Sequence, residues 1–233
     1  MSRAGPPDQP AVFPAVGNSR VVSSAQTGIH RDLPRLLARH RDHAFQRPIG
    51  AVSRLAVEAA LAQRAGRPLI LDSGCGVGQS TVKLARRFDD SFVLGIDQSA
   101  ARLARAPELP DNACLIRANL VDAWRVLAAR GERLARHYLL YPNPWPKIGH
   151  LARRWHGHAV FPELLALAGV LECRSNWAVY VAELAAAVTV LTGRAAVPEE
   201  LPADLALADP LTPFERKYAA SGQTLYRLVV DLG

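Results

Sequence analysis

The sequence predicts one α/β domain in which helices cover both faces of a mostly parallel sheet. Two observations lead to this fold class: short apolar runs alternate with helical stretches over residues 65–233, and the first of these runs ends in a glycine-rich turn. The length of 233 residues fits one α/β domain with a proper core and is too short to need two. Apolar residues make up 49% of the chain and charged residues 21%, which is ordinary for a soluble globular protein.

The N-terminal part of the chain departs from this alternating pattern. Residues 1–19 are rich in proline and hold no apolar segment of the kind a secretory signal needs, so we expect a flexible tail. Residues 20–64 are predicted as a basic helical extension. Its first helix is amphipathic, because Leu33, Leu36 and Leu37 recur at helical spacing, and an alanine-rich helix is expected after it.

The elements of the domain follow from the apolar runs and the stretches between them. Strands are predicted at residues 69–72, 92–97, 114–117, 138–141, 170–174 and 225–230. Helices are predicted near residues 79–88, 99–106, 122–130, 159–168 and 177–191. The tract 193–211 is rich in alanine, proline and acidic residues, and we expect a surface connection there.

Charge and cysteine usage narrow the functional classes. A formal net charge of +7 favours nucleic acid or an acidic surface as partner, because lysine and arginine neutralise phosphate. A basic protein from an arginine-rich proteome is the alternative. Cys75, Cys114 and Cys173 form no Cys-x-x-Cys pair, which argues against a disulfide framework or zinc site and for a reducing compartment. We expect no metal, no membrane span and a cytoplasmic location.

The first predicted strand leads into the turn Gly74-Cys75-Gly76-Val77-Gly78. Glycines permit positive φ and let a ligand approach the backbone closely. A dinucleotide-binding turn needs the spacing G-x-G-x-x-G, which is absent here. With Asp72 in front, the spacing resembles the D-x-G-x-G-x-G turn of class I S-adenosylmethionine-dependent methyltransferases. The carboxylate of Asp72 is then expected to help hold a cofactor that carries an ammonium and a sulfonium.

Two residues at the ends of the next strands extend this predicted cofactor site. Asp97 ends the second strand, about twenty residues downstream, where an acid typically accepts hydrogen bonds from ribose hydroxyls. Asn119 follows the third strand, and its side chain either contacts the adenine or caps the following helix.

A rigid platform, Pro142-Asn143-Pro144-Trp145-Pro146-Lys147, follows the strand predicted at 138–141. Open α/β sheets bind ligands at the carboxyl ends of their strands, so we expect the platform beside the cofactor turn. Arg153 and Arg154 come after it, with no acid between the platform and His158. These basic residues are expected to hold phosphate, and the solvated face of a helix start is the alternative.

Four features in chain order, spread over roughly residues 65–230, resemble the bacterial tRNA (guanine-N7) methyltransferase family. They are the glycine turn, the platform with its basic tail, Ser175-Asn176-Trp177 with Tyr180, and Thr212-Pro213-Phe214-Glu215. The resemblance implies a class I methyltransferase (Rossmann-like) single domain over residues 65–233, with a mostly parallel seven-stranded sheet whose last strands are antiparallel at one edge. It also implies S-adenosylmethionine as cofactor, and tRNA or another structured RNA as the partner that is methylated on guanine N7.

The same resemblance assigns roles to individual residues. Assigned to the cofactor are Asp72, Gly74, Cys75, Gly76, Gly78, Asp97 and Asn119. Assigned to the guanine and its nucleotide are Asn143, Trp145, Lys147, Arg153, Arg154, Asn176, Thr212, Phe214 and Glu215. Asn143 and Asn176 are the expected catalytic residues.

Asn143 and Asn176 stand where the family usually carries Asp. Guanine N7 has an in-plane lone pair and no proton, so its methylation needs no general base and depends mainly on orientation. An Asn accepts from one guanine donor through its carbonyl, but it presents an NH₂ beside it and carries no charge. We therefore expect the exchange to weaken purine selection more than it prevents methyl transfer.

Two other functions remain open on the sequence alone. Asn143-Pro144-Trp145 is also similar to the N-P-P-aromatic platform of amino-methyltransferases, which implies an amino group of RNA, protein or a small molecule as acceptor. A non-catalytic RNA-binding relative would retain the fold and the basic surface. The sequence leaves equally open whether Trp177 and Tyr180 stack on a base or belong to the core.

Overall fold

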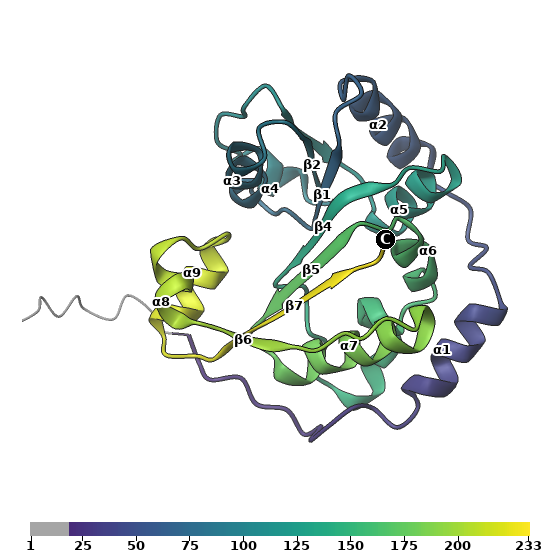
Figure 1. The fold of residues 1–233 in the computed structure, drawn as a ribbon, viewed down its shortest axis with the longest axis vertical. Helices are drawn as coiled ribbons and strands as arrows, with labels where there is room; N and C mark the ends of the chain where they lie inside the picture. The colour runs from purple at the N-terminus through teal and green to yellow at the C-terminus, as the bar shows by residue number, and fades with distance from the viewer. Residues whose placement is uncertain (1–18) are drawn as a thin grey trace, which may run out of the picture.

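The computed structural model describes residues 19–233, so the predicted tail, except for Ser19, lies outside the described residues. Seven strands of the described part form one sheet in the order β3-β2-β1-β4-β5-β7-β6 (Figure 1). They are β1 (Leu69–Ser73), β2 (Phe92–Asp97), β3 (Ala113–Arg117), β4 (Leu134–Leu140), β5 (Val170–Ser175), β6 (Glu199–Leu201) and β7 (Leu225–Asp231).

The first five strands in this list are parallel, as the register of β1 with β2 and β4 illustrates: Leu71 pairs with Leu94 on one side and with His137 on the other. Strand β7 runs antiparallel between β5 and β6. The predicted fold class is confirmed, including the seven strands and the antiparallel edge.

Helices cover both faces of the sheet. They are α1 (Leu33–Asp42), α2 (Ala51–Ala62), α3 (Gln79–Arg87), α4 (Ala100–Leu103), α5 (Leu120–Ala129), α6 (Phe161–Ala166), α7 (Ala178–Thr192), α8 (Ala203–Ala208) and α9 (Pro213–Ala220), with 3₁₀ turns η1 (Ile148–Arg153) and η2 (Trp155–Gly157). The larger core joins α1, α2, α5, α6 and α7 to one face of the sheet, and a smaller one joins α3 to the other face. None of the helices in residues 19–233 is long and apolar enough to cross a membrane.

The predicted N-terminal extension contributes to this core. Leu33 and Leu37 of α1 and Val57 of α2 are buried in the larger cluster, where α1 contacts α7 and α2 contacts α5. Figure 1 shows the chain before α1 passing along the outside of the molecule, below β6 and α7. The division of the chain at residue 65 stays a prediction, but these helices are packed as part of one globule.

The tract 193–211 differs from the sequence prediction. It holds the short edge strand β6 and the helix α8, and α9 follows directly. Strand β6 has only three residues and lies between Pro198 and Pro202. So short a segment has no alternating apolar pattern from which a strand could be predicted. These elements matter because the start of α9 forms one wall of the cavity described next.

Candidate functional site

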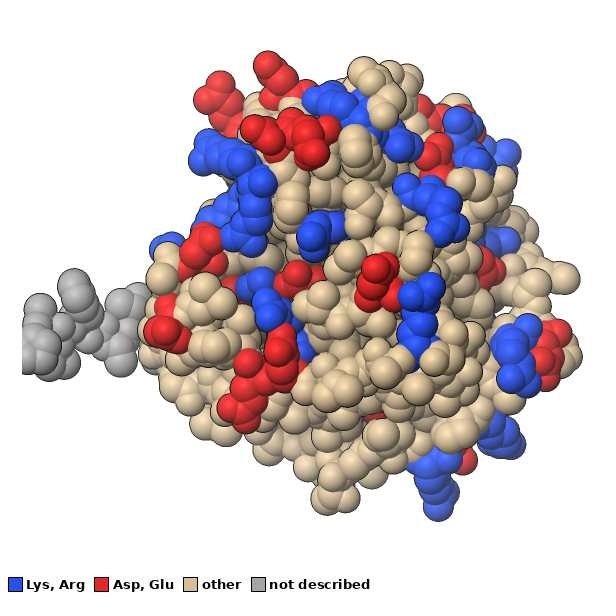
Figure 2. Space-filling view, in the orientation of Figure 1, with Lys and Arg blue, Asp and Glu red and all other residues tan. Residues whose placement is uncertain are grey.

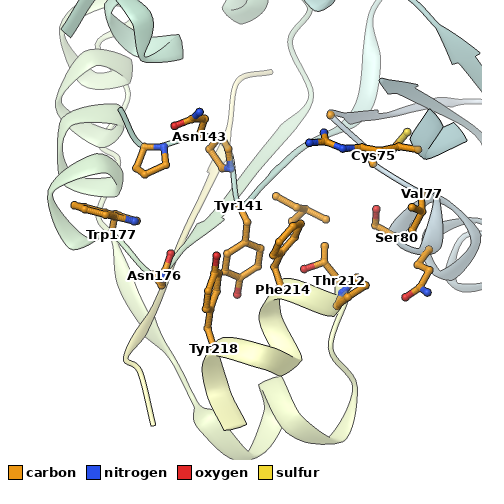
Figure 3. Close-up of a pocket in the computed structure, with 18 of the residues that line it drawn as sticks. Cys75, Val77, Ser80, Tyr141, Asn143, Asn176, Trp177, Thr212, Phe214 and Tyr218 are labelled. Carbon is orange, nitrogen blue, oxygen red and sulfur yellow. The ribbon is translucent and has the colours of Figure 1, made fainter. Parts of the chain in front are cut away.

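A cavity of about 490 Å³ lies at the carboxyl ends of β1, β4 and β5 (Figure 3). The strand order reverses between β1 and β4, and open α/β sheets bind their ligands at such a point. Four predicted segments line the cavity: the glycine turn, the end of β4 with the first residues of the platform (residues 140–144), Asn176 with Trp177, and the start of α9 at Thr212 to Phe214. Residues far apart in the sequence are thus brought to one site.

The glycine turn is shaped for close approach of a ligand. Gly74, Gly76 and Gly78 have φ values of 80°, 62° and 80°, a region that residues with a Cβ rarely adopt. A Cβ at Gly76 would meet no atom within 4 Å, so the backbone there is open to the cavity. A Cβ at Gly78 would lie 2.6 Å from Leu115 Cδ1, so this glycine also serves the packing of α3. The turn therefore fits a cofactor held against the backbone.

Asp72 supports the turn from behind. Its carboxylate is 1% exposed and accepts hydrogen bonds from the hydroxyls of Ser80 and Thr81, at 2.6 and 2.7 Å. Burial raises the pKa of Asp72 to about 6, although the two hydroxyl bonds favour the charged form. The side chain ties the start of α3 to β1 and does not line the cavity, so the predicted part of Asp72 in holding the cofactor stays a prediction, acting through the turn that it supports.

Asp97 connects the turn to the end of β2. Its Oδ2 accepts from the backbone N–H of Gly76 at 3.0 Å, and its Oδ1 accepts from Ser99 N at 2.8 Å. Arg102, which lines the cavity, approaches the same carboxylate at 3.5 Å. The predicted contact of Asp97 with ribose stays a prediction. Sequence reasoning missed Arg102, because a charged residue on a surface helix carries no signal of its own.

Asn119 caps α5. Its Oδ1 accepts from Val121 N at 2.9 Å and from Asp122 N at 3.4 Å. Asn119 lines a separate shallow depression beside Gln98 and not the main cavity. Of the two roles that the sequence left open, the structure supports the cap.

The platform is held in an unusual backbone conformation. Tyr141, which precedes the platform, and Trp145 within it have φ values of 51° and 45°. Positive φ at residues of this size is uncommon, costs about 1–3 kcal/mol each and clusters at functional sites. Between them, Asn143 accepts the backbone N–H of Trp145 on its Oδ1 at 3.2 Å, which leaves its NH₂ as the free donor of this exposed side chain.

The indole of Trp145 does not line the cavity. The Arg153 guanidinium lies over its ring at 4.9 Å from the centroid, and His150 contacts it edge-on. The predicted substrate role of this ring is therefore not supported by its position. Lys147 and Arg153 are exposed, and their predicted contact with phosphate stays a prediction.

Arg154 has a different role from the one predicted. It is 3% exposed and forms a buried ion pair with Glu183 of α7, while its Nε and Nη2 donate to the carbonyl of Trp145 at 3.3 and 3.1 Å. The predicted phosphate contact is wrong because the guanidinium is enclosed. It fixes the platform to α7 instead.

Glu183 is fully buried and accepts hydrogen bonds from two segments of the chain, residues 26–30 and 154–156. Gln26 Nε2, the backbone N–H of His30 and His156 Nε2 join Arg154 around its carboxylate. Burial alone would raise the pKa of Glu183, but these bonds outweigh it and lower the pKa to about 2. His156 is thereby structural, and the described residues hold no cluster of three or more possible metal ligands.

Glu215 and Thr212 organise the start of α9. The Thr212 hydroxyl accepts from Glu215 N at 3.0 Å and caps the helix. Glu215 is 0% exposed and accepts from Arg174 at 2.8 Å and from Leu211 N at 3.2 Å. Its predicted contact with guanine is wrong because no face of it reaches the cavity. Thr212 does line the cavity.

Aromatic side chains form the wall that α9 contributes (Figure 3). Phe214 is 54% exposed and stacks on Tyr218 with an interplanar angle of 24°, and Tyr218 contacts Tyr141 at 5.7 Å between ring centroids. Tyr218 was missed by sequence reasoning, although its place four residues after Phe214 puts both on one helix face. Trp177 also lines the cavity, whereas Tyr180 is buried in the core.

Comparison with known proteins assigns most of the chain to a family. A family model described as a putative methyltransferase matches residues 66–228. A tRNA (guanine-N(7)-)-methyltransferase of Streptomyces coelicolor is 30% identical over 131 residues, which are 51% of this chain and 46% of that protein. One of Treponema pallidum is 29% identical over 196 residues, covering 79% and 73%.

Among solved structures, the 16S rRNA methyltransferase KamB superposes with a TM-score of 0.55 at 17% identity, covering 81% of this chain and 97% of that one. At that identity the likeness concerns the fold alone.

Proposed function

Because the chain belongs to the family of putative methyltransferases, we propose that it transfers the methyl group of S-adenosylmethionine to guanine N7 in tRNA. The observation that carries the proposal is the convergence of the glycine turn, the Pro142–Pro144 platform, Asn176 and the start of α9 on one cavity. The relatives named as tRNA (guanine-N(7)-)-methyltransferases support the choice of acceptor.

The residues around the turn fit the cofactor. The open backbone at Gly76 and the carboxylate of Asp97 behind it would hold its adenosine and methionine parts, and S-adenosylmethionine supplies an electrophilic methyl group on a positively charged sulfur. Arg102 at the rim offers a cation to the cofactor's carboxylate or to the RNA.

The rest of the cavity has to orient a purine. Guanine N7 carries its own lone pair, so no side chain needs to remove a proton, and alignment with the methyl group is the main contribution. Asn143 and Asn176 present amide groups to the base, and Phe214 with Tyr218 offers a flat apolar surface for stacking.

Phosphate contacts would come from exposed cations near the platform, chiefly Lys147 and Arg153. On the face shown in Figure 2, basic and acidic side chains are interspersed and form no single basic patch. We therefore propose a local grip on the RNA beside the cavity. A cytoplasmic location, where tRNA is found, is part of the same proposal.

The amino-group acceptor receives less support, because the relatives are named as tRNA (guanine-N(7)-)-methyltransferases. In that chemistry the amide oxygen of Asn143 must accept from the target amine, and this oxygen, which accepts the N–H of Trp145, has one further lone pair for it. The non-catalytic alternative is opposed by the open glycine turn and its continuity with the platform.

The test is a methylation assay with labelled cofactor and bulk tRNA, followed by nucleoside analysis. Label in 7-methylguanosine supports the proposal, label in an N6- or N2-methylated base supports an amino acceptor, and RNA binding without label indicates a silent relative. Gly76→Ala should abolish cofactor binding in calorimetry. Gly66→Ala is the matched control. Gly66 has a φ of 76°, so alanine there meets the same kind of backbone strain as at Gly76, and its new Cβ has no atom within 4 Å. Gly66 lies away from the cavity.

A further inference from the structure

Asn176 takes part in a buried chain of hydrogen bonds that reaches the N-terminal segment. Its Nδ2 donates to Gln223 Oε1 at 2.8 Å, and Gln223 Nε2 donates to the carbonyls of Arg20 at 2.9 Å and Ser19 at 3.4 Å. Both amide side chains are buried, at 6% and 8% exposure. Ser19 is itself attached through its N–H to the Ser221 hydroxyl at 3.1 Å.

The donor and acceptor roles along this chain are forced. Backbone carbonyls only accept, so the nitrogen of the Gln223 amide must face Ser19 and Arg20. The oxygen of Gln223 must then face Asn176, and Asn176 must answer with its own nitrogen. Turning either amide around would bring two acceptors together inside the protein, where an unsatisfied polar group is costly.

The last member of the chain is the oxygen of Asn176. This residue lines the cavity, and none of the hydrogen bonds among residues 19–233 involves its Oδ1 (Figure 3). One N–H of the amide nitrogen donates to Gln223, and this bond fixes the direction in which the amide points. Asn176 therefore offers its neutral acceptor oxygen to the cavity.

We infer that Gln223 is a specificity-determining residue: held by the carbonyls of Ser19 and Arg20, it turns the Asn176 amide so that its acceptor oxygen faces the substrate. This inference rests on the proposed function, since the substrate group that the acceptor selects is the N–H donor edge of guanine. Gln223 acts through Asn176 and is a positioning residue.

The consequence for position 176 is opposite to what the sequence alone indicates. An Asp there would set a carboxylate against Gln223 Oε1, because Gln223 cannot turn without opposing the two carbonyls. A lysine at 223 would donate to the carbonyls and also to an Asp at 176, which would leave the second carboxylate oxygen facing the cavity. Paired with Asn176, the same lysine would instead attract Oδ1 and turn the NH₂ toward the substrate.

The experiment is a double-mutant cycle of Asn176→Asp and Gln223→Lys, with Gln63→Lys on the exposed end of α2 as the control for the charge change. We expect each single variant to lower kcat/KM for tRNA about tenfold, while the affinity for S-adenosylmethionine is unchanged. The double variant should regain activity to within about threefold of the wild type. Losses that multiply in the double variant, or a fully active Gln223→Lys, would overturn the inference.

Urea unfolding of the same four proteins gives a readout that needs no RNA. Each single variant should lower the urea concentration at the unfolding midpoint, and the double variant should recover it. The reason is that the hydrogen-bond relay from Asn176 through Gln223 to Ser19 and Arg20 exists in the free protein. If the wild type methylates no tRNA but the midpoints show this recovery, the proposed function fails and the relay stands. Midpoints that fall further in the double variant reject the relay whatever the acceptor is.

Discussion

Arg153 and Arg154 are neighbours in sequence, and the structure predicts that replacing each by methionine changes a different property: stability for Arg154 and tRNA binding for Arg153. Arg154→Met removes the guanidinium from a pair in which Glu183 is fully buried. Removing one partner of a buried ion pair destabilises a protein by about 3–5 kcal/mol. The bonds to the Trp145 carbonyl are lost as well, so the platform should loosen.

Arg153→Met should hardly change stability. Arg153 is exposed, and its contact with the Trp145 ring is worth about 0.5–1 kcal/mol. If Arg153 contacts an RNA phosphate, its loss weakens binding to every tRNA by a similar factor. It also reduces the slope of log K against the logarithm of the salt concentration by about one.

Two measurements on both variants decide the matter. Urea unfolding followed by tryptophan fluorescence gives the free energies of unfolding, and tRNA binding at several salt concentrations gives the slope. The reasoning is refuted if Arg154→Met costs less than about 1 kcal/mol or if Arg153→Met is the more destabilising of the two.

Three further predictions concern other parts of the molecule. Burial lowers the pKa of His137 to about 3, so the neutral imidazole contributes to the free energy of unfolding above pH 6.5 and this contribution is lost as the pH falls toward 3. At pH 5 the loss is about 2 kcal/mol. Unfolding of His137→Gln, measured from pH 7 to 4, should lack this pH-dependent loss, and the same pH profile as the wild type would contradict the prediction. Phe214→Ala should lower kcat/KM for tRNA by about tenfold or more through lost stacking, while Leu205→Ala, an exposed apolar residue of α8, should leave it unchanged; equal effects would count against a stacking wall. Lys147→Ala should weaken tRNA binding more at low than at high salt, and a salt-independent effect would argue against a phosphate contact.

The parts of the site that were predictable from sequence are those encoded in short segments. The turn at 74–78 can be predicted from its glycine spacing, and the platform can be predicted from its prolines. Both segments require particular residues at particular backbone positions. Both segments follow parallel strands, and the carboxyl ends of parallel strands meet at one edge of the sheet, so the two could be expected side by side.

The roles of single side chains were harder to predict, because each depends on a partner distant in sequence. Arg154 looks like an RNA contact until Glu183, on another element, is found beside it. Glu215 likewise needs Arg174 of β5 to explain its burial. The sequence shows that residue 176 is an asparagine, but it does not show which atom of the amide faces the cavity. That choice depends on Gln223 and on backbone carbonyls near the N-terminus.

The order of strands at the sheet edge has a consequence for biosynthesis. Strand β6 is made before β7, but β7 lies between it and β5, so β6 has no neighbour to join until the final strand arrives. Chains leave the ribosome N-terminus first, and only Thr224 separates Gln223 from β7. A nascent polypeptide can therefore assemble its first five strands before Tyr218 completes the lining of the cavity and before β7 covers the edge of β5.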